Sequence, residues 1–193
     1  MSQPVAPLRE ATLASLSTIR TRNLRALTDT LNELEPDDHV AATIRSPFYG
    51  LFIVRGRVVR SCATDRLLVG GQHLGTTGRA RKPLPELLAL APAEDGPNDI
   101  ADEMCVADIA HGDIIAANFN QHPYGRFSVT GFTVHAPAAA DALITGGWYL
   151  TGRELRTAAP RLLALRLIAD AQSHELPIPA RITRWPEPDT NSH

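Results

Sequence analysis

The sequence is poor in aromatic residues and in lysine, and both shortages narrow the function classes. Aromatic residues make up 5% of the 193 positions, which leaves few rings on which nucleic acid bases could stack. Lys82 is the only lysine, so arginine carries almost all the positive charge, in an arginine-, alanine- and proline-rich composition typical of a GC-rich genome. With a net charge of -2, the chain is not a generally basic nucleic acid coat, and an electrostatic partner requires a local patch.

Cysteines and long apolar runs are also scarce. Cys62 and Cys105 have no CxxC spacing and no neighbouring metal-ligand cluster, a pattern typical of reduced thiols inside the cell. No stretch approaches the roughly 18 uninterrupted apolar residues of a membrane span, and the N-terminus lacks the apolar core of a secretion signal. We therefore expect a cytoplasmic protein without a membrane-spanning segment.

The sequence carries no local signature of catalysis. No HExxH or HxxxH pair places two imidazoles on one helical face, and there is no dinucleotide fingerprint, phosphate-binding loop or G-x-S-x-G elbow. Cys62 could be a nucleophile beside Arg60 and Asp65, but a buried or half-buried thiol is the simpler interpretation. His111 and Asp113 could form an acid/base corner, although a turn whose aspartate repeats Asp38 is the simpler interpretation. We predict no catalytic residue, no metal and no cofactor; the motifs favour a binding protein over an enzyme without deciding the question.

What the sequence does contain is an internal duplication. Residues 38–90 and 113–165 align at a constant offset, which changes by one residue in a loop and then holds again. The matched stretches are DHVAATI at Asp38 with DIIAANF at Asp113, and YGLFIVRGRVV at Tyr49 with YGRFSVTGFTV at Tyr124. Because a chance alignment would not regain its register after a gap, we interpret these segments as two copies of one unit.

Each copy predicts three strands followed by a helix. Alternation in residues 51–59 indicates a half-buried strand, and Gly56 and Gly131 fall in the middle of such strands, where a bulge or a tight bend would account for them. Pro85 and Pro160 each open the expected helix. The expected fold is therefore α+β: a tandem duplication of a small SH3-like β-barrel or half-barrel unit (β-β-β-α), packed about a pseudo-two-fold axis, with N- and C-terminal helices.

The flanking segments predict those two terminal helices. Apolar residues recur at three- to five-residue steps over residues 7–34, which indicates an amphipathic helix that either covers the sheet or forms a homodimer contact. Asn98 is placed to cap a short helix, and Thr157 to cap a longer one that ends near Ser173. The predicted organisation is an N-terminal helix (1–37), a first repeat (38–90), an acidic linker (91–112), a second repeat (113–165) and a C-terminal part (166–193) containing the helix end, an extended segment and a tail.

Features common to both copies are most simply explained by the fold, so functional candidates are sought where the copies differ. The first copy is rich in arginine, and the segment between the copies is acidic. The candidate anion-binding residues are Arg55, Arg57, Arg60, Arg79 and Arg81. They predict a non-catalytic binding or assembly module that docks an anionic partner, duplex nucleic acid or an acidic protein surface. The alternative is that these arginines are a solvated sheet face paired with the acidic linker.

The aromatic residues give a second hypothesis, a protein-protein interaction module. Trp148 and Tyr149 occupy positions that are polar in the first copy, and Tyr49 and Tyr124 lie in the proline-containing loops SPFYG and QHPYG. Burial of the tryptophan and a turn-stabilising role for the two loops are the simpler interpretations.

A third hypothesis is a small-molecule-binding protein or an enzyme with its site between the two repeats. Such a site would be an enclosed cavity lined by His122, His135 or Cys62.

Overall fold

The computed structural model describes residues 24–62, 64–75, 85–93, 104–136, 142–150 and 161–183. In these residues almost all regular structure is antiparallel sheet, accompanied by the helix α2 (Leu24–Glu33) and a short 3-10 turn, η1 (Val106–Asp108). The strands of the first copy are β1 (His39–Ser46), β2 (Gly50–Arg60), β3 (Leu67–Val69), β4 (Gln72–His73) and β5 (Glu86–Pro92). Those of the second copy are β6 (Ile114–Gln121), β7 (Gly125–Ala136), β8 (Ala142–Thr145), β9 (Trp148–Tyr149) and β10 (Arg161–Ala169).

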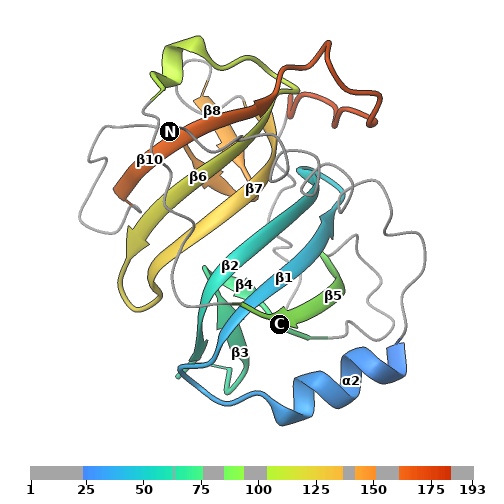
Figure 1. Ribbon diagram of the computed structural model, residues 1–193, viewed down its shortest axis with the longest axis vertical. Helices are drawn as coiled ribbons and strands as arrows, with labels where there is room; N and C mark the ends of the chain where they lie inside the picture. The colour runs from blue at the N-terminus through green and yellow to red at the C-terminus, as the bar shows by residue number, and fades with distance from the viewer. Residues whose placement is uncertain are drawn as a thin grey trace, which may run out of the picture.

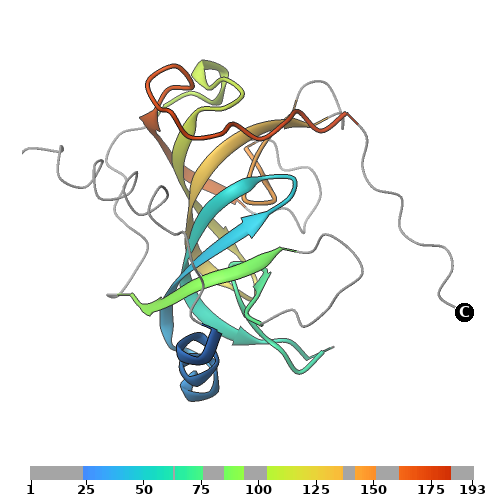
Figure 2. The same ribbon diagram turned by 90° about the vertical axis from the view of Figure 1, so that its right-hand side faces the viewer.

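The main sheet has the strand order β10-β6-β7-β2-β1-β5. Strands β3 and β4 extend from β2, and β8 and β9 extend from β7 in the same way. Figure 1 shows the strands β10, β6 and β7 beside the strands β2, β1 and β5, with α2 at one end of the molecule, and Figure 2 shows how strongly the sheet curls. The fold is a curled antiparallel half-barrel.

The two copies pair their strands in the same register. Ser46 faces Gly50 across β1 and β2, and Gln121 faces Gly125 across β6 and β7. The turn that leads into the first strand of each copy is also closed by the same kind of hydrogen bond. The carboxylate of Asp38 accepts the N–H of Glu35 at 2.8 Å, and that of Asp113 accepts the N–H of Ala110 at 2.7 Å.

The expected α+β class with terminal helices is wrong. The stretches ELLALAP and RLLALRLIA, predicted to be helical, form β5 and β10, which pair with β1 and β6. Short runs of leucine and alanine suit a buried helix and a buried strand equally, and pairing with a sheet overrides the helix propensity of these residues. In the residues that the structure describes, a copy is therefore all β, not β-β-β-α. Thr157, the proposed cap of the C-terminal helix, lies outside the described residues.

The N-terminal helix is described only over α2, and both residues 1–23 and the proposed cap Asn98 lie outside the described residues. Leu27 of α2 is 5% exposed, and Leu31 and Leu34 pack against the main core. This face of α2 therefore covers one end of the sheet. In the part of the chain that the structure describes, no helix is long and apolar enough to cross a membrane.

The two copies meet where β2 pairs with β7. Phe52 lies opposite Gly131 and Phe127 lies opposite Gly56, in a ladder without a register shift. A Cβ atom added to Gly131 would lie 2.5 Å from the Cβ of Phe52, and one added to Gly56 would lie 2.8 Å from the Cβ of Phe127. These glycines are therefore required by close cross-strand packing of a phenylalanine from the other copy, and not by a bulge.

Candidate functional site

The structure describes three of the five candidate arginines, and Arg79 and Arg81 lie outside the described residues. Arg55 and Arg57 alternate with buried positions of β2 and so lie on the outer face of the sheet. Arg60 is an odd number of residues further along, at the exposed end of the strand, and therefore does not share that face. Arg55 and Arg57 therefore share one face of β2, and Arg60 lies at its exposed end.

Nearby carboxylates pair with two of these arginines, Arg57 and Arg60. Arg57 donates to Asp37 at 2.8 Å and to the carbonyl oxygen of Pro123 at 3.1 Å, and Arg60 donates to Asp65 at 3.1 Å. A further arginine, Arg45, lies 4.0 Å from Glu86. These pairs use Asp37, Asp65 and Glu86, and most acids of the linker lie outside the described residues.

Trp148 packs into the junction between the copies. Its ring lies beside Phe127 and Phe119, with centroid distances of 5.5 and 6.4 Å, and its Nε1–H donates to the carbonyl oxygen of Gly70 at 3.0 Å. Gln72, at the matching position of the first copy, donates to the carbonyl oxygen of Gly146 at 3.1 Å. The tryptophan therefore serves the contact between the copies and leaves Tyr149, which is 39% exposed, as the accessible aromatic of this pair.

The two Tyr-Gly loops are turns. Gly50 and Gly125 have φ angles of 67° and 70°, in the left-handed region that favours glycine. Tyr124 contacts Phe127 edge-on at 6.4 Å, and Tyr49 packs against the main core. Burial raises the pKa of Tyr49, and the neighbouring Tyr149 raises it further.

The structure shows the surroundings of the residues considered for catalysis. Cys62 is exposed, contrary to the expectation of a buried or half-buried thiol, and Cys105 is exposed as well. The carboxylate of Asp113 accepts backbone N–H groups of Ala110 and Ala171, at 2.7 and 2.9 Å, and so holds a turn. Within the described residues, no three His, Cys, Asp or Glu side chains lie close enough together to hold a metal ion.

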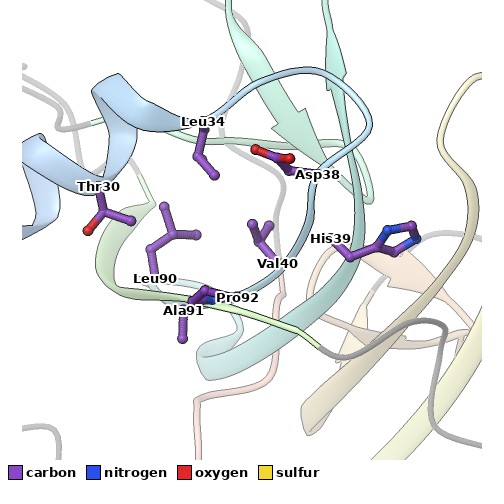
Figure 3. Close-up of a pocket in the computed structure, with 8 residues that line it drawn as sticks. All are labelled: Thr30, Leu34, Asp38, His39, Val40, Leu90, Ala91 and Pro92. Atoms are coloured by element: carbon purple, nitrogen blue, oxygen red, sulfur yellow. The ribbon is translucent and has the colours of Figure 1, made fainter.

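The structure shows a groove that sequence reasoning missed. It measures about 230 Å³ and is formed by α2, the turn that follows it, β1 and the edge strand β5. Its lining residues are Thr30, Leu34, Asp38, His39, Val40, Leu90, Ala91 and Pro92. Figure 3 shows Leu34, Val40 and Leu90 converging on the groove, with the carboxylate of Asp38 at its rim and the ring of His39 turned away.

In the second copy, the segment that precedes β6 contacts the edge of β10. The N–H of Met104 donates to the carbonyl oxygen of Leu165 on β10 at 3.2 Å, and the N–H of Leu167 donates to the sulfur of Met104 at 3.2 Å. Leu165 is 2% exposed, whereas Leu90, its counterpart on β5, is only partly buried. The difference lies in segments that precede the matched parts of the copies, so a comparison of those parts could not reveal it.

The segment that borders the groove is acidic. Residues 26–38 contain no lysine or arginine, and their carboxylates are Asp29, Glu33, Glu35, Asp37 and Asp38. Asp37 is paired with Arg57. Helical spacing places Glu33 next to Thr30 of the groove wall. The rim of the groove therefore attracts positive charge.

Comparison with known proteins gave no match: no protein-family model fits the chain, and neither the curated proteins nor the solved structures include one that is significantly similar.

Proposed function

We propose that this protein is a non-catalytic, cytoplasmic binding module whose binding site is the groove between α2, β1 and β5. The site accepts an apolar segment of a protein partner. The observation that carries the proposal is in the second copy, where Met104 hydrogen-bonds to the edge strand β10, the counterpart of β5. The space between α2 and β5 in the first copy is an open groove with apolar walls and a polar rim.

The experiment uses the chain's own segment as the probe. The peptide MSVADI, which corresponds to residues 104–109 with serine in place of Cys105, is titrated into the isotope-labelled full chain. We expect the NMR signals of Thr30, Leu34, Val40 and Leu90 to shift as the peptide is added.

A matched pair of variants tests the location. Thr30→Trp fills the groove, whereas Asn32→Trp adds the same side chain to an exposed position of α2 that does not line it. The first variant should abolish the shifts, and the second should retain them. Shifts that appear elsewhere, or that survive Thr30→Trp, would refute the proposal.

The anionic partner is a second candidate, favoured by the exposure of the Arg57 and Arg60 side chains, 42% and 50%. Exposed ion pairs contribute little stability, so a phosphate or carboxylate could replace Asp37 or Asp65. Binding of duplex DNA should then weaken steeply with salt and be lost in an Arg55→Ala/Arg57→Ala/Arg60→Ala variant. Binding that is unaffected by salt would rule this candidate out.

A further inference from the structure

The groove has an edge strand as one wall, and the main chain of that strand is placed to accept hydrogen bonds. The N–H of Ala93 donates to the carbonyl oxygen of His39 on β1 at 2.9 Å, and Ala91 lies opposite Ala41. The main-chain groups of successive residues in an antiparallel strand point in opposite directions. Ala91 and Ala93 face β1, so the main-chain groups of Leu90 and Pro92 point away from it. Pro92 has no N–H, so this part of the edge is richer in acceptors than in donors.

The second copy shows how such an edge is used. Leu165 corresponds to Leu90, since they lie opposite the matched residues Ala117 and Ala42. The carbonyl oxygen of Leu165 accepts the N–H of Met104, whose side chain lies against the main core. One extended residue thus supplies both a main-chain donor and an apolar side chain.

We infer that the partner of the groove is an extended, basic peptide segment that adds to the edge of β5. An apolar side chain enters between α2 and β5, and its own N–H donates to the carbonyl oxygen of Leu90. Lysine or arginine residues on either side face Glu33 and Asp38. This is strand addition, in which main-chain hydrogen bonds give affinity and side-chain pockets give specificity. The inference rests on the proposed function and specifies the partner of the same site.

Three peptides with capped ends test the inferred partner separately from the proposed binding site. They are KMSVK, its acidic analogue EMSVE, and KMSVK methylated on the methionine nitrogen, each titrated into the full chain at low salt. Loss of one hydrogen bond corresponds to roughly a tenfold loss of affinity. We expect KMSVK to bind at least about tenfold more tightly than either of the other two.

Charge reversal on the protein supplies the matched control. Glu33→Lys should remove the preference for KMSVK over EMSVE, whereas Glu175→Lys, the same change at an exposed position of the C-terminal segment, should leave it intact. If all three peptides shift the groove signals with equal affinity, the inferred partner is wrong and the groove remains a binding site. If none of them shifts these signals, the proposed function fails with it.

Discussion

Gly131 and Gly56 show how the absence of a side chain sets the contact between the copies. Alanine is usually better tolerated than glycine within a strand. Here we expect alanine to destabilise the fold instead, because a new Cβ would lie 2.5 Å from the Cβ of Phe52 or 2.8 Å from that of Phe127. We predict that Gly131→Ala lowers the free energy of unfolding by about 1–3 kcal/mol, and Gly56→Ala by less, as measured by urea denaturation.

Gly75 provides the control, since nothing lies within 4 Å of a Cβ atom added there. Gly75→Ala should be neutral or slightly stabilising. Equal effects at Gly75 and Gly131 would contradict the close packing described for β2 and β7.

Trp148 and Tyr149 should respond differently to substitution. Trp148→Phe removes the donor to the carbonyl oxygen of Gly70 and should lower the free energy of unfolding by about 1–3 kcal/mol. Tyr149→Phe, at an exposed side chain, should change it by less than about 0.5 kcal/mol. Thermal or chemical denaturation measures both, and a reversed order would mean that the tryptophan does not join the copies.

At the scale of elements, histidines fasten the C-terminal segment, residues 170–183, to the sheet. His174 contacts the carbonyl oxygen of Gly112 at 3.0 Å, and the N–H of Ile182 donates to the carbonyl oxygen of His135 at 2.9 Å. The N–H of His135 in turn donates to Nδ1 of His111 at 3.2 Å. Figure 2 shows this segment running across the sheet as a red coil.

This arrangement predicts a pH dependence. Burial lowers the pKa of His111, and Arg181 and His135 lower it further, while a hydrogen bond with the backbone of Pro179 opposes them. A histidine in an unfolded chain titrates near pH 6.5. The imidazole of His111 therefore binds a proton more tightly in the unfolded chain than in the folded chain. The stability that His111 contributes is therefore present above about pH 6.5 and is lost as the pH falls through the lower folded pKa.

The matched variant is His111→Asn, which keeps an acceptor for the N–H of His135 but cannot titrate. Urea unfolding at a series of pH values should show a smaller loss of stability below about pH 6.5 in the variant than in the parent. Identical profiles of stability against pH in parent and variant would show that neutral His111 does not hold the C-terminal segment in place.

The elements also show what the sequence could and could not predict. The positions of β1, β2, β6 and β7 followed from alternating and β-branched residues. β5 and β10 did not, because their short runs of leucine and alanine have no alternation that would distinguish a strand from a helix. The groove could not be found because it depends on how α2 sits beside β5, a contact between segments far apart in sequence.

At the scale of the whole molecule, each copy depends on the other. Phe52 of the first copy covers Gly131 and Gly146 of the second, and Phe127 covers Gly56 and Gly70 in return. We predict that residues 1–103 and 104–193, produced separately, give no folded monomer. Each half should gain structure only by pairing, with the other half or with a second copy of itself, as measured by circular dichroism and light scattering. A half that folds as a monomer would contradict this mutual dependence.

The central claim, that the groove beside β5 binds an extended segment, is tested most directly by intermolecular NOEs in a complex of the full chain with the peptide KMSVK. The account predicts NOEs from the methionine methyl group of the peptide to the methyl groups of Leu34, Val40 and Leu90. A bound peptide whose NOEs lie only on another surface, such as that around Tyr149, would contradict it.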